Sequence, residues 1–188
     1  MSTDLSPWQL QEAASSERRD RLLVAFDRSA VAAEFPGCGS EVASALGALA
    51  DEGARTVLEL LPHDGTSWED IYRVVVPDAD WTSSTAPGFP HYSDYIRNGG
   101  SRDLDALILH SRFDSDSVLT MASQYRHLLR PRGKIVYHFG RNEDHYQAPP
   151  EAWRHFIVRH DRAVFGWRVG QLYVGWVKPE TRRADKEW

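Results

Sequence analysis

Three histidines stand at the ends of apolar runs in this sequence, and imidazole is the side chain best suited to moving protons near neutral pH. His63 follows the run at 56–61, His110 closes the run at 104–110, and His138 lies near the end of the run that begins at residue 134. In an open α/β sheet, ligands bind at the carboxyl ends of the strands. We therefore take these three histidines as candidate catalytic residues; the alternative is that each is a hydrogen-bonded, partly buried side chain.

Polar side chains accompany the histidines at the same strand ends. Asp64 and Thr66 follow the first run, and Ser111 and Arg112 follow the run at 104–110. A guanidinium can hold a carboxylate or phosphate with two parallel hydrogen bonds, or it can form a surface ion pair with a neighbouring aspartate. Ser111 and Arg112 are thus candidate substrate-binding residues.

No metal site is expected from the sequence. The three histidines are the right kind of ligand, but they lack a motif spacing such as His-x-x-x-His on a helix. Cys38 is the only cysteine. The chain therefore forms no internal disulfide and no cysteine-cluster zinc site.

The segment 85–100 is rich in Pro and Gly and carries His91, Tyr92 and Tyr95. A loop of this composition that leaves a strand end is a candidate lid, with these three residues as candidate substrate-binding groups. The alternative is a loop that packs over a gap in the fold. The sequence leaves both possibilities open.

The elements that must position these residues are organised around residues 104–140. An apolar run, an amphipathic segment at 114–130 and a second apolar run predict a strand, a helix and a strand of a parallel sheet. Pro131 is expected to end the helix, and Gly133 to supply the turn into the second strand.

The remaining elements follow from the same periodicities and from turn residues. We expect a helical segment at 6–34 broken at Ser15 and Ser16, and a helix capped by Ser40 that ends near Gly53. We also expect strands at 56–61 and 81–84, a helix from 68 that ends before Pro77, a short helix from Pro149, and an antiparallel hairpin over 164–177.

Composition narrows the classes of function. The 188 residues are 41% hydrophobic with a net charge of -5 and a pI near 5.9, so a broad nucleic-acid surface is not expected. No apolar run is long enough to cross a membrane and the first residues lack an export pattern, so we expect a cytoplasmic protein. We divide the chain into an N-terminal helical segment (1–37) packed on the core, an α/β domain (38–178) and a charged tail (179–188).

Residues 40–177 resemble the class I S-adenosylmethionine-dependent methyltransferases. The resemblance rests on short motifs: Val-Leu-Glu-Leu at 57–60, Pro-Asp-Ala-Asp at 77–80, Asp-Ala-Leu-Ile-Leu at 105–109 and Leu-Leu-Arg-Pro-x-Gly at 128–133. It implies a three-layer, Rossmann-like α/β fold whose mostly parallel sheet ends in an antiparallel hairpin. It also implies S-adenosylmethionine as the cofactor, with Leu61, Asp64, Gly65, Thr66 and Thr85 at the cofactor-binding positions.

Those cofactor positions depart from the family pattern. The three glycines of the family's Gly-x-Gly-x-Gly loop fall on Leu61, His63 and Gly65, so only the last is kept. A side chain at the first position fills space that the ligand needs. The carboxylate that binds the ribose hydroxyls falls on Thr85, which cannot make a charge-assisted hydrogen bond. Residues 85–103 are too few for the usual helix and strand, so one part of the fold is expected to be trimmed.

Three functions remain open. The first is a methyltransferase-like protein that no longer binds S-adenosylmethionine in the standard way and acts as a partner subunit or binds another small ligand; no cofactor is expected. The second is a divergent, active small-molecule methyltransferase that uses S-adenosylmethionine. The third is a lyase, cyclase or isomerase that uses histidine acid–base chemistry. The hairpin could also form a homo- or hetero-oligomer.

Overall fold

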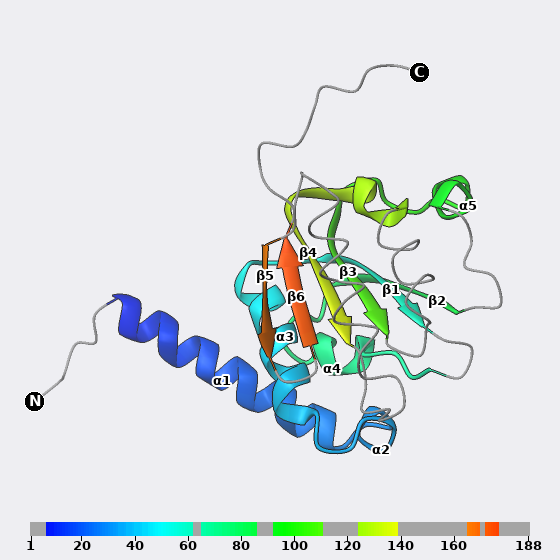
Figure 1. Ribbon diagram of the computed structural model, residues 1–188. Helices are drawn as coiled ribbons and strands as arrows, with labels where there is room; N and C mark the ends of the chain where they lie inside the picture. Colours follow the sequence, from blue (N-terminus) through cyan, green and yellow to red (C-terminus); the bar gives the residue numbers. More distant parts are fainter. Residues whose placement is uncertain are drawn as a thin grey trace, which may run out of the picture.

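The computed structural model of the chain describes residues 7–61, 65–85, 92–110, 124–138, 165–169 and 172–176 (Figure 1). Six strands form one sheet in the order β2-β1-β3-β4-β6-β5. Their bounds are β1 Thr56–Leu61, β2 Asp80–Thr85, β3 Leu104–His110, β4 Leu129–His138, β5 Phe165–Val169 and β6 Leu172–Trp176. The first four strands of this order are mutually parallel, β6 runs antiparallel to β4, and β5 runs antiparallel to β6.

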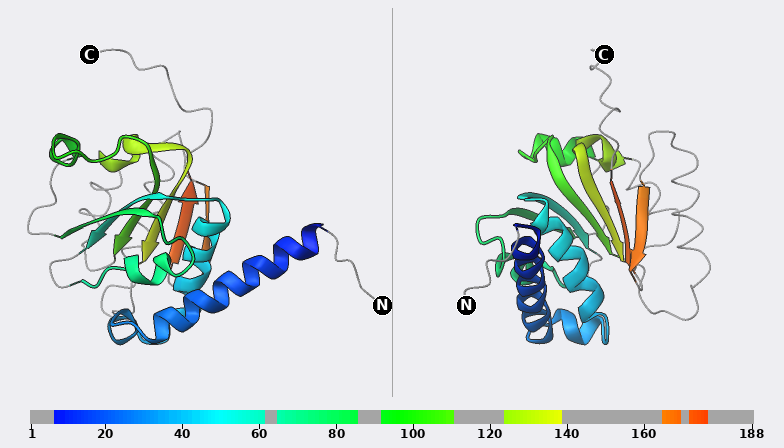
Figure 2. Two further views of the ribbon diagram at one scale, coloured as in Figure 1. Left: turned by 180° about the vertical axis from the view of Figure 1, so that it is seen from behind. Right: turned by 90° about the vertical axis from the view of Figure 1, so that its left-hand side faces the viewer.

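Helices cover one face of this sheet, as Figure 2 shows for α1, α3 and α4. The described helices are α1 Pro7–Asp27, α2 Val31–Glu34, α3 Gly39–Asp51, α4 Glu69–Arg73 and α5 Tyr92–Arg97, with a 3-10 turn η1 at Arg126–Leu128. The four parallel strands of this sheet, with helices packed on one face, confirm the predicted α/β, Rossmann-like fold.

The core lies between the sheet and these helices. Every residue of β3 is buried, and so are the last five of β1, as expected for central strands of a parallel sheet. Alternate strand residues face the helices, because side chains of a strand point to opposite faces in turn. On the helix side, Val57, Ala106, Ile108 and Val136 belong to one buried cluster with Leu46 of α3.

The register between β1 and β3 is held at their amino ends by Asp105. Its Oδ2 accepts hydrogen bonds from the backbone N–H groups of Arg55 (2.6 Å) and Thr56 (3.0 Å), and its Oδ1 pairs with Arg130 at 2.6 Å. One carboxylate thereby joins the starts of two strands and the beginning of a third. The register between β1 and β3 decides which of their residues lie side by side at the carboxyl ends of the strands.

Helix α1 differs from the sequence prediction, because it continues through Ser15 and Ser16 to Asp27. The Ser15 hydroxyl donates to Asp51 of α3 at 2.8 Å, and Arg18 pairs with the same carboxylate. The serine therefore has a tertiary partner and does not compete for the helix backbone. The break falls instead between α1 and α2, where Ser29 Oγ donates to the Phe26 carbonyl at 2.7 Å.

The helix expected at 114–130 is described only from residue 124, and its predicted end is wrong. The chain passes through η1, and strand β4 already begins at Leu129. Proline disfavours a helical conformation for the residue before it, so Pro131 excludes Arg130 from the helix. Arg132 has φ of 68°, and the pairing with β3 shifts register here.

The segment between β2 and β3 is short, as predicted, and its described residues contain no strand. The prediction of an irregular loop is wrong for residues 92–97, which form α5. This helix ends at Arg97. Gly99, two residues further on, has a φ of +89° that favours glycine, and the Gly100 amide donates to the Tyr95 carbonyl. β2, the strand before this segment, stands first in the sheet order and is therefore an edge strand.

Candidate functional site

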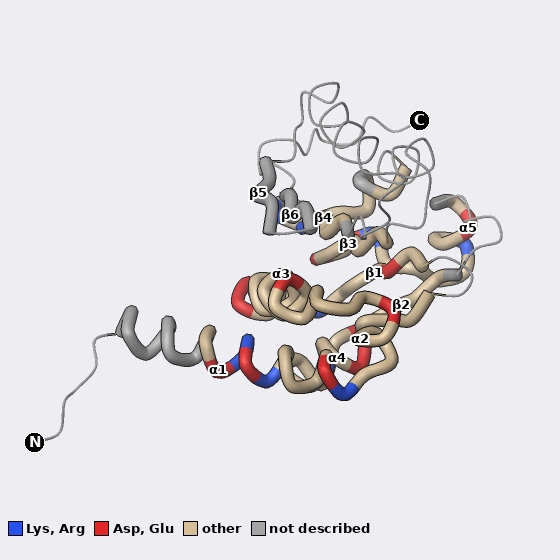
Figure 3. Tube along the Cα trace, turned by 60° about the horizontal axis from the view of Figure 1, so that its bottom comes forward, with Lys and Arg blue, Asp and Glu red and all other residues tan. Residues whose placement is uncertain are grey.

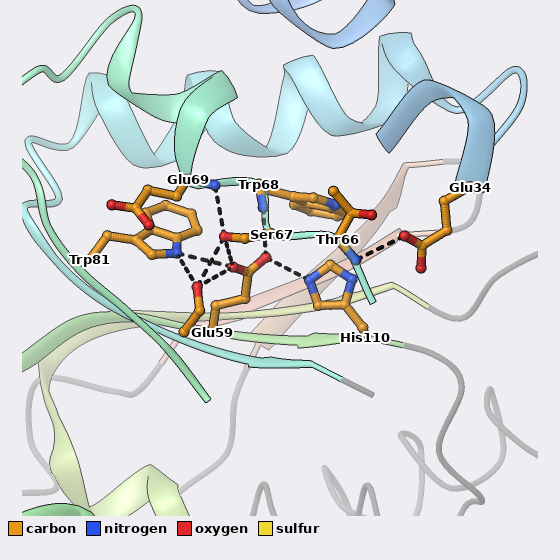
Figure 4. Close-up of polar contacts among 9 residues, drawn as sticks. Glu34, Glu59, Thr66, Ser67, Trp68, Glu69, Trp81 and His110 are labelled. Carbon is orange, nitrogen blue, oxygen red and sulfur yellow. Dashed lines mark hydrogen bonds and ion pairs between the residues drawn. The ribbon is translucent and has the colours of Figure 1, made fainter. Parts of the chain in front are cut away.

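A buried carboxylate is the centre of the site. Glu59 stands in the middle of β1 with 0% of its surface exposed, and it points toward the helix side of the sheet (Figure 4). Two neighbouring strands and the start of α4 supply hydrogen-bond donors to it. Oε1 accepts from the Trp68 backbone N–H (2.9 Å) and His110 Nε2 (2.8 Å), and Oε2 accepts from Ser67 Oγ (2.5 Å), Ser83 Oγ (2.9 Å) and Trp81 Nε1 (3.0 Å).

The strand register explains why these groups meet. Glu59 pairs with Ser83 across β1 and β2, so their side chains lie on the same face, and Trp81 is the diagonal neighbour two residues back. Across β1 and β3, Glu59 pairs with Ile108, so His110 is the neighbour two residues further on that face. Because successive side chains of a strand point to opposite faces, the side chains of Glu59, Ser83, Trp81 and His110 all lie on the face that the helices cover.

The start of α4 completes the network. Ser67 Oγ donates to Glu59 and accepts from the Glu69 backbone N–H at 3.1 Å, so it links the carboxylate to the first turn of the helix. It also lies 3.0 Å from Ser83 Oγ. The loop after β1 is thereby fixed to two strands before the helix begins.

The network keeps Glu59 ionised. Burial by itself raises the pKa of the carboxyl, but the hydrogen bond and electrostatic attraction of His110, with the hydrogen bonds from Ser67 and the Trp68 amide, outweigh it and lower the pKa below its ordinary value. An ionised carboxylate only accepts hydrogen bonds, so all five partners act as donors. Glu59 is a structural anion whose accepting capacity is used inside the protein.

Among the partners of Glu59, His110 has the side chain best suited to proton transfer. Only 1% of its side chain is exposed, and its ring lies beside those of Trp68 (centroids 4.7 Å apart) and Phe35 (6.0 Å). Nε2 points to Glu59, whereas Nδ1 is buried and makes no hydrogen bond within the part of the chain that the structure describes. A carboxylate that orients an imidazole in this way is the arrangement used for proton transfer in many enzymes.

The pair lies at the switch point of the sheet. From β1 the chain moves to β2 on one side and then crosses to β3 on the other side, and ligands bind in the crevice outside the carboxyl ends at such a point. His110 is the last residue of β3. The predicted placement of a histidine at this strand end is thus correct, although its role remains a prediction.

The loop after β1 carries a second internal carboxylate contact. The Thr66 backbone N–H donates to Glu34 Oε2 of α2 at 2.9 Å (Figure 4). A free amide at this position would suit an anionic or polar ligand group. Here α2 supplies the acceptor, and Gly65 and Thr66 are both half-buried.

Leu61 and Thr85 meet at the place where the resemblance puts the cofactor. Leu61 is 2% exposed and still belongs to β1, in parallel register with Thr85 at the end of β2. Regular strand pairing therefore continues through the position of the first family glycine. The only acidic residue of β2 is Asp80, at the opposite end of the strand.

Tyr95 does not lie at the carboxyl ends of the strands, where a lid was expected. Its hydroxyl accepts the Ser101 backbone N–H at 3.1 Å just before β3 starts, and its ring packs edge-on against Tyr125 just before β4 starts. Figure 1 shows α5 beside the amino ends of these strands. Burial, with the nearby charge of Asp80, raises the pKa of Tyr95 against the smaller opposing effect of the Ser101 hydrogen bond.

Three further predicted site residues belong to described elements. Thr85 lies in β2, Tyr92 in α5 and His138 in β4, and His138 pairs in register with His110. The predicted residues outside the described part of the chain are His63, Asp64, His91, Ser111 and Arg112. Among described residues, no three His, Cys, Asp or Glu side chains are grouped as a metal site. No described helix is long and apolar enough to span a membrane.

The sequence prediction missed Glu59 as a site residue. Its signal was present, because a carboxylate inside the apolar run Val-Leu-Glu-Leu-Leu must be buried and therefore needs partners. Ser67 and Ser83, which donate to Glu59, and Glu34, which accepts from Thr66, gave no such signal. Their polar types are ordinary for loops, strands and helix ends, and they meet only through the strand register and the packing of α2 and the loop after β1.

Comparison with known proteins gave likenesses to solved structures alone, since no family model and no curated protein matches the sequence. The S-adenosylhomocysteine-bound methyltransferase of Podospora anserina is 10% identical, over 95% of this chain and 98% of that chain, with a TM-score of 0.49. An O-methyltransferase from Bacillus cereus in complex with SAH is 14% identical, over 95% and 84% of the two chains, with a TM-score of 0.43. The release-factor-specific protein-(glutamine-N5) methyltransferase of Alicyclobacillus acidocaldarius is 16% identical, over 66% and 81%, with a TM-score of 0.42. The function of this chain is therefore argued from its own residues.

Proposed function

We propose that this chain is a methyltransferase-like protein that has lost standard S-adenosylmethionine binding and binds another small ligand at the carboxyl ends of its strands. The observation that carries the proposal is the pairing of Leu61 with Thr85. At these two positions the family presents bare main chain and a carboxylate. Here a buried isobutyl group and a neutral residue stand in their place.

The energetics support this proposal. Displacing a buried leucine side chain to make room for a nucleoside costs about 1.5–3 kcal/mol in lost burial. Replacing a carboxylate by a hydroxyl removes charge assistance from the hydrogen bonds to a ribose diol. Because each 1.4 kcal/mol is a factor of about ten in affinity, the two changes together are sufficient to abolish useful binding.

The internal contacts of the loop point in the same direction. The Thr66 amide is bonded to Glu34, and the Glu59 carboxylate accepts five hydrogen bonds. Groups that could have bound a ligand are thus satisfied by the protein itself. His110 is the exception, because its Nδ1 makes no hydrogen bond to a described residue.

Thermal unfolding with S-adenosylmethionine and S-adenosylhomocysteine tests the proposal. A ligand at 100 times its Kd stabilises the folded state by about 2.7 kcal/mol, which raises Tm by several degrees. We expect no shift of Tm for the unmodified chain at millimolar ligand. The matched variant Leu61→Gly/His63→Gly/Thr85→Asp restores the family pattern and should gain a shift of Tm.

Micromolar binding of either molecule by the unmodified chain would overturn the proposal. That outcome would favour the divergent methyltransferase, and methyl transfer abolished by Gly65→Val would then support that reading. A cofactor-independent lyase, cyclase or isomerase would show turnover without any added nucleoside and a pH profile with a limb near the histidine range.

A further inference from the structure

An asparagine followed by two glycines stands at the end of α5. Asn98, Gly99 and Gly100 come directly after Arg97, the last residue of the helix, and Asn98 and Gly99 are both exposed. A Cβ atom placed on Gly99 would meet nothing within 4 Å. No hydrogen bond to a described residue holds the side-chain amide of Asn98. The turn is therefore open to water, and the asparagine side chain is free to change its rotamer.

An exposed asparagine before a glycine can react with its own backbone. The nitrogen of Gly99 attacks the side-chain carbonyl carbon of Asn98, and a nitrogen–carbon bond forms. The proton of the Gly99 nitrogen passes to the side-chain nitrogen, which leaves as ammonia. Water then opens the five-membered imide at either of its carbonyls and gives aspartate or isoaspartate at position 98. Glycine has no Cβ and can adopt the backbone angles that this approach needs, so it hinders the attack least.

Two backbone hydrogen bonds oppose the reaction in the folded chain. The attacking N–H group of Gly99 donates to the Ile96 carbonyl at 3.0 Å, and the N–H group of Gly100 donates to the Tyr95 carbonyl at 2.9 Å. Both bonds belong to the end of a helix of six residues, and the ends of elements open at little cost in free energy. Opening this one turn is sufficient for the attack, and the sheet stays folded.

The product differs from asparagine in charge and in backbone length. A carboxylate just beyond the last residue of α5 lies near the negative end of the helix dipole, which is unfavourable. Isoaspartate also adds one carbon to the main chain before Gly99 and so shifts the following amides. Gly100 lies so close to the Tyr95 ring that a Cβ atom would be 2.4 Å from it. A shift of the backbone at this point therefore moves that ring.

We propose that Asn98 is a site of spontaneous deamidation in the folded chain, and that its product loosens α5 from the core. The reaction consumes one water molecule and releases one ammonia, and it needs no other reactant. The inference goes beyond the proposed function and does not depend on it.

Peptide mapping by mass spectrometry tests the site. The full, folded chain is kept at mildly alkaline pH, and its two asparagines are compared over time. Asn142, which is followed by Glu143, is the internal reference within the same sample. We expect Asn98 to convert to a mixture of aspartate and isoaspartate while Asn142 stays largely intact. Conversion of Asn142 as fast as that of Asn98, or no conversion of Asn98, would overturn the proposal.

Asn98→Gln is the matched control for the structural effect, because attack on its longer side chain must close a six-membered ring. Hydrogen exchange is measured on both chains before and after the same incubation. Exchange at residues 92–97 should become faster in the unmodified chain alone. An equal increase in Asn98→Gln, or no increase in a converted sample of the unmodified chain, would contradict the loosening of α5. No nucleoside is present in these experiments, so their failure is distinguishable from failure of the proposed function.

Discussion

Glu59 joins three strands and the start of α4 through one side chain with no exposed surface. Each of its five donors would lose an acceptor if the carboxylate were removed. An unpaired buried donor costs far more than the modest net gain of a normal hydrogen bond. The residue is therefore expected to matter for stability as well as for the orientation of His110.

We predict that Glu59→Gln lowers the free energy of unfolding by about 1–3 kcal/mol at neutral pH, because the amide cannot accept at both former oxygen positions. The folded-state pKa of Glu59 is lowered, so its stabilisation is present above the unfolded pKa and is lost as the pH falls through the folded value. The difference between unmodified chain and variant should therefore shrink below roughly pH 4.

Urea unfolding at neutral and acid pH measures this difference. Ser83→Ala is the matched control, since it removes one donor to Glu59 and keeps the charge. Its effect should be smaller, about 0.5–1.5 kcal/mol, and nearly independent of pH. A Glu59→Gln effect of equal size at both pH values would show that ionisation of Glu59 does not contribute.

At the scale of elements, α5 illustrates how one close contact fixes a segment. A Cβ atom placed on Gly100 would lie 2.4 Å from the Tyr95 ring, whereas one placed on Gly47 of α3 would meet Leu22 at an ordinary 3.7 Å. The first position has no room for a methyl group, and the second has. The two glycines therefore form a matched pair for the same substitution.

Gly100→Ala should destabilise the chain by about 1–3 kcal/mol, because the ring of Tyr95 must move from its place beside Tyr125. Gly47→Ala should leave stability unchanged or raise it by up to about 1 kcal/mol, since alanine favours helix. Urea unfolding gives both values, and hydrogen exchange should show faster exchange at residues 92–100 in Gly100→Ala alone. Equal stability of the two variants would refute the packing argument.

The polar site and α5 also lie at opposite ends of the strands. His110 closes β3, whereas Tyr95 contacts residues that precede β3 and β4. The position of Tyr95 therefore fits the alternative in which this segment packs on the fold, which the sequence left open beside a lid. Sequence could not separate the two, because a buried tyrosine with a hydrogen-bonded hydroxyl looks the same in sequence as one that contacts a ligand.

At the scale of the whole molecule, both acidic and basic positions occur along α1, whereas the charged residues of α3, Glu41 and Asp51, are all acidic (Figure 3). The N-terminal helix is part of the core, since Leu22 and Phe26 belong to the same buried cluster as Val57. Removing α1 would therefore expose that cluster.

We propose that the chain associates through its C-terminal strands, because β5 is the last strand in the sheet order and unpaired strand edges pair with other chains. Light scattering coupled to gel filtration should show a dimer or a larger oligomer at micromolar concentration. Gly166→Pro in β5, which removes a backbone donor, should lower the mass to that of a monomer. A monomer for the unmodified chain at all concentrations would contradict self-association.

The sequence by itself determined the elements whose pattern is local. The apolar runs of β1 and β3, the glycine that ends α3 and the short span between β2 and β3 followed from residue type and spacing. Where a tertiary partner changed the outcome, the prediction failed. Ser15 remained helical because Asp51 of another helix binds it, and the helix before Pro131 ended early because β4 pairs with β3 from Leu129.

Only the tertiary structure decided the site. The sequence placed His110 at a strand end and showed a carboxylate within an apolar strand, but it gave no means of joining residues 51 positions apart. The parallel register sets Glu59 beside Ser83 and two residues from His110, and α2 brings Glu34 to the loop. The physical reason is that burial forces every one of these polar groups to find a partner, and which partner it finds depends on the packing of distant segments.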